Sequence, residues 1–177
     1  MSPRRSRWSS AAALAAALLG LAAGGETFDF MPKGGRALLL EVATGAQLHE
    51  VVQQQRSEQQ WLQWASEPAR GKPLDEKQQA TLAAYLAVNM PAPAAAQDPA
   101  ALPRDGRDLA WEQCQSCHSL FSSFLAQDGT ATRWRNMFLA PFHRNIRMSP
   151  QEREEFARYA EINMPMKVEE VPAELRF

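Results

Sequence analysis

The stretch Cys114-Gln115-Ser116-Cys117-His118 decides how the rest of this 177-residue chain is interpreted, because its spacing suits the covalent capture of a porphyrin. Two thiols one helical turn apart can each form a thioether bond to one vinyl group of a haem, and the imidazole that follows can ligate the iron. The motif therefore predicts one haem c, bound covalently through Cys114 and Cys117, with His118 as the proximal axial ligand.

Two other interpretations of the cysteines are half of a zinc site and a redox-active dithiol. A zinc site needs a second pair of ligands, and only His49 and His143 remain as histidines outside the motif. A thioredoxin-like dithiol belongs to a βαβ pattern, which the chain lacks. Haem attachment is therefore favoured over both.

The N-terminus has the pattern of a cleaved export signal. Basic residues between Arg4 and Arg7 precede an apolar stretch from Ala11 to Ala23, and small residues up to Gly25 offer cleavage points. The apolar stretch is too short for a comfortable membrane span. We therefore predict that residues 1–23 are a signal peptide and that the protein is periplasmic, with a membrane anchor only if this segment is not cleaved.

Charge places few constraints on the partner. Removing residues 1–23 takes three arginines and no acid, which turns 19 basic and 20 acidic residues into 16 and 20, a balance of −4. Nothing in this composition suggests that the protein binds nucleic acid. The mild acidity is compatible with a basic patch on a redox partner.

Two segments of the chain resemble one another. Residues 75–91 read DEKQQATLAAYLAVNMP, and residues 149–165 read SPQEREEFARYAEINMP, so that an alanine, a tyrosine and the Asn-Met-Pro ending coincide at an offset of 74. Each segment begins with a capping-box-like pattern and ends before a proline. Each is therefore predicted to be a helix of about four turns.

The similarity extends upstream at an offset of 71 residues. This register aligns Arg36, Leu38 and Glu41 with Arg107, Leu109 and Glu112. It also places Ala43, Ala46 and Gln47 opposite the two cysteines and the histidine of the motif. The first half is therefore predicted to be a copy of the second that has lost its haem ligands.

Residues 92–105, between the two copies, are rich in proline and alanine and are predicted to be a semi-rigid linker. Each half is small for an autonomous core, and the first has no porphyrin to fill it. Its core is expected to be filled by Trp61, Trp64, Phe28, Phe30 and the Leu38–Leu40 run. No segment shows the alternation of a β-strand, so the predicted fold class is all-α.

With the motif in a first helix and a capped last helix that carries Tyr159, residues 105–165 resemble a small class I-like cytochrome c domain. In that family a helix ends in C-x-x-C-H, and a C-terminal helix packs across it. Here residues 107–117 match the first helix, and residues 132–139, around Trp134, match a middle helix. The resemblance implies a haem domain of three to four helices.

The resemblance also implies a domain order. A haemless helical domain of similar fold, residues 24–91, precedes the linker, and the haem domain covers residues 106–166. Residues 167–177 form a C-terminal tail.

Several side chains compete to be the distal axial ligand. His143 is preferred, because it is the only histidine in this half outside the motif and the first half has no counterpart. Met148 lies thirty residues after His118, nearer the long separation typical of cytochromes with His/Met ligation, and Met137 lies one turn after Trp134. A site without a second protein ligand is the remaining alternative.

These expectations together predict a periplasmic cytochrome c with one haem that carries single electrons between redox partners and is not itself an enzyme. No flavin or nicotinamide fingerprint and no nucleophile motif suggests a second active site. The alternatives are a haem-carrying subunit of a periplasmic oxidoreductase complex and a gas-binding haem sensor. The haemless half, with Trp61 and Trp64, is a candidate docking module for a partner enzyme.

Overall fold

The computed structural model describes residues 28–67, 72–93 and 98–177, so the predicted signal peptide lies outside the described residues. Within the described ranges the chain is helical and contains no β-strand, which confirms the predicted all-α class. None of the helices in these ranges is both long enough and apolar enough to cross a lipid bilayer.

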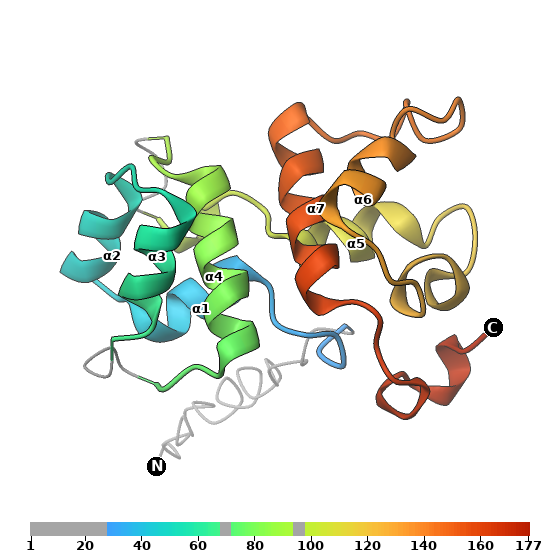
Figure 1. Cartoon of the computed structure of the whole chain (residues 1–177), viewed down its shortest axis with the longest axis horizontal. Helices are drawn as coiled ribbons and strands as arrows, with labels where there is room; N and C mark the ends of the chain where they lie inside the picture. Colours follow the sequence, from blue (N-terminus) through green and yellow to red (C-terminus); the bar gives the residue numbers. More distant parts are fainter. Residues whose placement is uncertain (1–27, 68–71, 94–97) are drawn as a thin grey trace, which may run out of the picture.

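The helices form two groups that lie side by side (Figure 1). The first group is α1 (Gly35–Val42), α2 (Ala46–Val52), α3 (Glu58–Ala65) and α4 (Glu76–Asn89). The second is α5 (Gly106–Cys114), the π-helical turn η3 (Phe121–Leu125), α6 (Ala131–Met137) and α7 (Pro150–Asn163). Short 3-10 turns are η2 (Pro99–Ala101), η4 (Val168–Glu170) and η5 (Ala173–Leu175). Helices α4 and α7 face each other along the boundary between the groups.

The two long helices begin and end where the sequence predicts. The Asp75 carboxylate accepts the Gln78 N–H at 2.8 Å, and the Gln78 side chain accepts the Asp75 N–H, which completes a capping box at the start of α4. Ser149 and Glu152 form the same arrangement at the start of α7. Both helices end at the asparagine of Asn-Met-Pro, because a proline cannot continue the hydrogen-bonding pattern.

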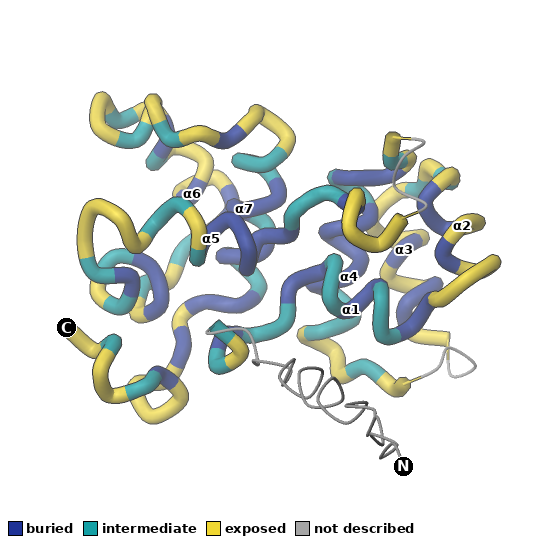
Figure 2. The backbone as a smooth tube through the Cα atoms, turned by 180° about the vertical axis from the view of Figure 1, so that it is seen from behind, coloured by how far each residue is buried: buried dark blue, intermediate teal, exposed yellow. Residues whose placement is uncertain are grey.

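Each half has its own hydrophobic core, and in Figure 2 the buried backbone runs through the interior of both. In the first core Trp61 and Trp64 are 0% and 4% exposed and pack edge to face, with ring centroids 5.6 Å apart. The tryptophans therefore fill the core, as predicted. Because they are buried, the two tryptophan side chains are not exposed to a docking partner.

The segment that leads into each half packs into the core of the other half. Met31 lies in the second core, whereas its counterpart at the offset of 71, Leu102, lies in the first. Phe28 and Phe30 pack on Trp111 of α5, with ring centroids 5.4 and 6.3 Å apart, so the prediction that they fill the first core is wrong. The end of the predicted linker also packs more closely than its composition indicates, since Leu102 is buried there.

A reciprocal pair of hydrogen bonds holds this exchange in place. The Tyr159 hydroxyl donates to the carbonyl oxygen of Pro32 at 2.7 Å, and the Tyr85 hydroxyl donates to that of Pro103 at 2.8 Å. Each proline leads into the half opposite its tyrosine. The two halves therefore lock each other through equivalent bonds.

Glycine begins the first helix of each half because the last helix lies directly against it. A Cβ added to Gly35 would stand 2.0 Å from the Cβ of Tyr85, and one added to Gly106 would stand 2.1 Å from the Cβ of Tyr159. Neither position has room for a side chain without moving the tyrosine backbone, so this close crossing requires glycine in both halves.

Matching ion pairs support the predicted register. Lys33 pairs with Glu41 in the first half, and Arg104 pairs with Glu112 in the second, at the offset of 71 residues. Equivalent residues of the two halves therefore make equivalent contacts, so the repeat is present in the structure as well as in the sequence.

The interface between α4 and α7 shows the same equivalence between the halves. Asn89 Nδ2 donates to Glu155 Oε2 at 3.0 Å, and Asn163 Nδ2 donates to Thr81 Oγ1 at 3.0 Å. Each asparagine also donates to a backbone carbonyl one turn earlier in its own helix. Because all four side chains are buried, these bonds satisfy polar groups that would otherwise be costly to bury.

Asp105 joins the starts of α1 and α5. One carboxylate oxygen accepts the Asp108 N–H at 3.1 Å and caps α5, while the other accepts the N–H groups of Arg36 and Ala37 at 3.1 and 3.4 Å. Gly34, the N-cap residue of α1, provides no side-chain cap. One buried carboxylate thus satisfies the N-termini of helices from both halves.

Glu155 of α7 is buried at the same junction. Its Oε1 atom accepts the Gly106 N–H at 3.0 Å, and its Oε2 atom accepts the bond from Asn89. Burial, together with the neighbouring charges of Asp105 and Asp108, raises the pKa of Glu155 to about 8. The contact between the halves therefore contains a carboxyl group that titrates near neutral pH.

We predict that Asp105→Ala destabilises the protein by about 2 kcal/mol or more, whereas Asp75→Ala costs about 1 kcal/mol. Asp75 is the matched control, because it caps α4 alone and is exposed, while Asp105 serves two helices and is buried. Urea unfolding of the full chain measures both losses. Equal losses would contradict the shared cap.

A second prediction concerns the pH dependence of stability. Because the pKa of Glu155 in the folded protein is about 8 and its ordinary value is 4.5, the folded state keeps a proton that the unfolded state releases between these pH values. The contribution of this group is complete below pH 4.5 and is lost as the pH rises through 8, by up to about 1.4 kcal/mol per pH unit.

Glu155→Gln should reduce this slope, whereas Glu76→Gln, at an exposed position, should leave it unchanged. Chemical unfolding between pH 5 and pH 8 measures the slope. The idea fails if the wild-type protein is equally stable across this range, or if the Glu155→Gln variant loses stability as steeply as the wild type.

Candidate functional site

The motif lies at the end of α5 and in the turn that follows. Cys114 is the last residue of the helix, Cys117 lies in the turn, and His118 lies in a bend before η3. The helix predicted over residues 107–117 thus ends three residues earlier. The turn after α5 brings Cys117 and His118 to the same cavity as Cys114.

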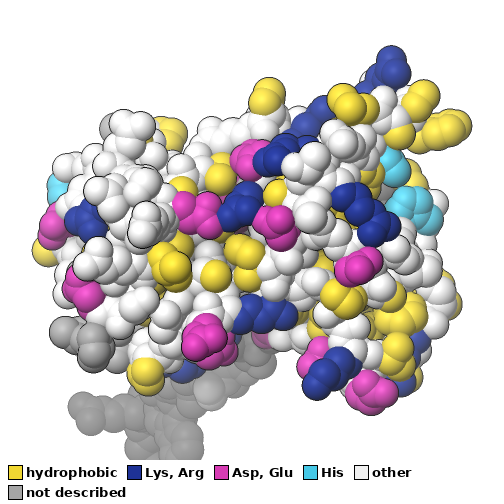
Figure 3. All heavy atoms as spheres, in the orientation of Figure 1, with side chains coloured by type: hydrophobic (Ala, Val, Ile, Leu, Met, Phe, Trp, Pro, Cys, Tyr) yellow, Lys and Arg dark blue, Asp and Glu magenta, His cyan; other side chains and the backbone are white. Residues whose placement is uncertain are grey.

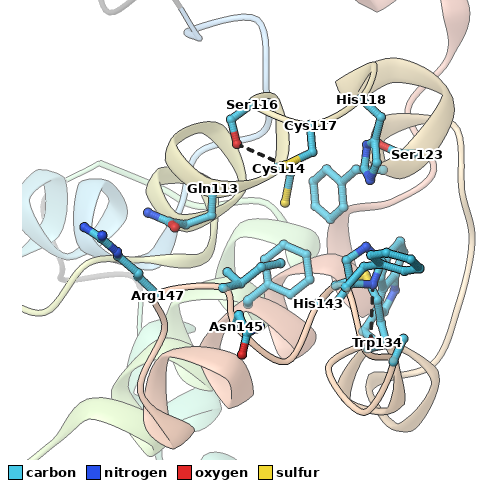
Figure 4. Close-up of a pocket in the computed structure, with 16 residues that line it drawn as sticks. Gln113, Cys114, Ser116, Cys117, His118, Ser123, Trp134, His143, Asn145 and Arg147 are labelled. Atoms are coloured by element: carbon cyan, nitrogen blue, oxygen red, sulfur yellow. Dashed lines mark hydrogen bonds between the residues drawn. The ribbon is translucent and has the colours of Figure 1, made fainter.

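This cavity has a volume of about 720 Å³ (Figure 4), which falls in the range of pockets that hold small molecules and cofactors. One wall is the motif, and the opposite wall is the loop between α6 and α7. Among the described residues that line the cavity, Arg147 is the only lysine, arginine, aspartate or glutamate. The interior is therefore mainly apolar and carries no acidic group.

Three aromatic side chains form a rigid floor. The rings of Phe124, Trp134 and Phe156 are buried and contact one another, with centroids between 5.2 and 6.0 Å apart. The Trp134 Nε1 donor is buried without a hydrogen-bond partner, and so is that of Trp61 in the first half. The unpaired indole donor is therefore not specific to the cavity.

His118 and His143 approach each other across the cavity. Their ring centroids are 6.1 Å apart and their planes are nearly perpendicular, at 83°. In Figure 4 the His118 ring points from the upper segment toward His143 on the loop below. The Nδ1 atom of His143 lies 3.3 Å from the carbonyl oxygen of Met137, so a proton on Nδ1 would be donated there and would leave the Nε2 lone pair free for a metal ion.

The structure separates the candidates for the distal ligand. His143 and Met137 line the cavity, whereas Met148 is buried in the second core and is not among the lining residues. Of the two thioethers considered, only that of Met137 therefore borders the cavity.

The two thiols have different surroundings, and no disulfide joins them. Cys114 is largely buried, and burial raises the pKa of its thiol to about 12, while Cys117 is exposed. A redox-active dithiol depends on a thiol with a lowered pKa, which is the opposite of what surrounds Cys114. In the described part of the chain, no group of three or more His, Cys, Asp and Glu side chains is placed to hold a metal ion.

The counterpart of the motif in the first half is built differently. Ala43 is buried just after α1, and Ala46 and Gln47 begin α2. The apolar face of α2 then closes the first core with Leu48, Val51 and Val52. In the second half the residues after the motif form only a turn and η3, and the cavity lies beside them.

Sequence analysis identified the motif, His143 and Met137, but not all of the cavity wall. It missed Phe124, Phe142 and Arg147, which no motif marks.

Comparisons of the chain with models of protein families, with curated proteins and with solved structures each give no match. Function must therefore be inferred from the chemistry and geometry of the cavity.

Proposed function

We propose that the cavity binds one haem c, attached covalently through Cys114 and Cys117, and that the protein is an electron carrier. The observation that carries this proposal is that both thiols of the C-x-x-C-H motif, His118 and His143 border one mainly apolar cavity. When bound, the haem iron supplies a one-electron couple between its ferric and ferrous states. The residues of the chain bind it, orient it and limit the access of water.

The cavity suits a large, flat, mainly apolar group. It is lined mainly by apolar and aromatic side chains, and none of the described residues in its lining is acidic. The thiols lie on one side, where each could add its S–H across a vinyl double bond without any net oxidation.

The spacing of the histidines suits axial ligation of one iron by both. The two rings lie 6.1 Å apart, centroid to centroid, at one cavity, so His118 and His143 could hold one iron between them. The Met137 carbonyl, which accepts from His143 Nδ1, would fix the ring orientation.

Ligation by His118 and His143 has consequences for function. It leaves no open coordination position, which favours electron transfer over gas binding. It also predicts a lower reduction potential than His/Met ligation, because a thioether stabilises ferrous iron. Attachment of haem c outside the cytoplasm agrees with the proposed signal peptide, residues 1–23, and with a periplasmic location. A haem-carrying subunit of an oxidoreductase complex is the second form that this proposal can take.

The covalent attachment can be tested directly. In cells that export the chain and attach haem c, the purified protein should keep its pigment after denaturation and extraction with acidified organic solvent. The Cys114→Ser/Cys117→Ser double variant should release or lack the pigment, whereas Ser116→Ala, within the same motif, should retain it. Pigment that is extracted from the wild-type protein, or is never present in it, would contradict covalent attachment of haem.

The distal ligand has its own test. The oxidised wild-type protein should show no far-red charge-transfer band from sulfur to iron, and reduced His143→Ala should bind carbon monoxide at least tenfold more tightly than the wild type, because a coordination position opens. Met137→Leu changes the other candidate ligand on the cavity wall. It should alter neither the oxidised spectrum nor the affinity of the reduced protein for carbon monoxide. A sulfur band that disappears in Met137→Leu would assign the ligand to that methionine instead.

A further inference from the structure

The loop between α6 and α7 exposes a large apolar surface beside the cavity. Phe142 is 91% exposed and Leu139 is 73% exposed, although both are large hydrophobic residues that proteins usually cover. Phe142 also lines the cavity. Apolar side chains exposed together next to a functional cavity are typical of a surface that binds another molecule.

The same loop is locally basic in a chain whose net charge is −1, or −4 without the predicted signal peptide. Arg144 and Arg147 are exposed, and neither forms an ion pair with any residue that the structure describes. Other arginines nearby differ, since Arg133 pairs with Asp128 and Arg135 pairs with Glu154. Figure 3 shows apolar and basic side chains together at this corner of the molecule, close to the histidines.

We infer that this patch, defined by Leu139, Phe142, Arg144 and Arg147, docks an electron-transfer protein whose own redox centre is bordered by carboxylates. This inference rests on the proposed haem, because it places the contact at the edge of the cavity. Electron transfer needs the two centres to be close, and the patch includes two exposed residues of the cavity wall, Phe142 and Arg147. Apolar contacts supply affinity there, and the two arginines select an acidic partner.

Screening explains how an acidic protein can bind an acidic partner here. At physiological ionic strength the Debye length is about 8 Å, so a docked partner responds to the charges next to it more than to the net charge of the molecule. A membrane surface covers a wider area and would meet the acidic remainder of the chain as well. The local charges therefore favour a compact protein over an anionic bilayer.

The dependence of the reaction rate on salt gives a test of sign. The probe is a reduced plant-type ferredoxin, an acidic protein that gives up one electron as the haem iron accepts one, mixed with the oxidised holoprotein in a stopped-flow instrument. If the net charges of the two proteins determine their association, the proteins repel each other, and the rate constant rises with ionic strength. If the charges of the patch determine it, the proteins attract each other, and the rate constant falls as salt is added.

We expect the rate constant of the wild-type protein to fall severalfold between low and moderate salt. Arg144→Gln/Arg147→Gln should lower the rate at low salt by about tenfold and remove or reverse the salt dependence. The control Lys72→Gln/Lys167→Gln changes the net charge by the same amount at positions outside the loop and should keep the falling trend. Leu139→Ser, which does not line the cavity, should slow the reaction without changing its salt dependence.

Three results would overturn the inference: a rate constant that rises with salt in the wild-type protein, an equal loss in the lysine control, or co-sedimentation with phosphatidylglycerol vesicles that depends on the arginines. The last would assign the patch to a membrane. The visible spectrum of each variant is recorded first. A wild-type protein without bound haem would refute the proposed function itself, whereas a normal spectrum with the wrong salt dependence would refute only the docking surface.

Discussion

The capping of two helices by one buried carboxylate is the contact on which the arrangement of the halves depends. Asp105 belongs to the second half, yet it satisfies the start of α1 as well as that of α5, because Gly34 has no side chain to do so. Around it, Tyr85 and Tyr159 each bond to the chain that leads into the opposite half. Neither set of contacts can form unless both halves are folded and in register.

The two halves share one helical arrangement but differ in the residues that fill their interiors. Glycines, tyrosines and asparagines that fix the crossing of the helices occur in both halves, whereas the residues that fill the interior differ. In the first half α2 closes the core with aliphatic side chains. The second half keeps a cavity of about 720 Å³ beside the cysteines, lined mainly by apolar side chains, which leaves room for a ligand. A covalently held porphyrin would occupy that room.

Features written in local patterns could be predicted from the sequence, and those that depend on long-range packing could not. The helices that Asp75 and Ser149 cap follow from hydrogen-bonding rules that act within a few residues. The all-α class follows from the lack of strand alternation, and the repeat follows from similarity at a constant offset. The motif likewise identified Cys114, Cys117 and His118. The packing of Phe28 and Phe30 into the opposite core leaves no local signal, because a hydrophobic residue does not itself specify which of two cores it will join. The projection of Phe142 from its loop is equally invisible until the chain is folded.

The exchange of leading segments makes the chain comparable to a domain-swapped dimer whose two subunits have been joined end to end. In such a pair of separate chains, assembly would depend on how often they meet. Here the connection through residues 92–105 holds the halves at a high effective concentration, so that the pairing is intramolecular and independent of dilution. Covalent union also removes the need for the two copies to stay identical, which leaves one free to specialise in chemistry while the other serves as scaffold.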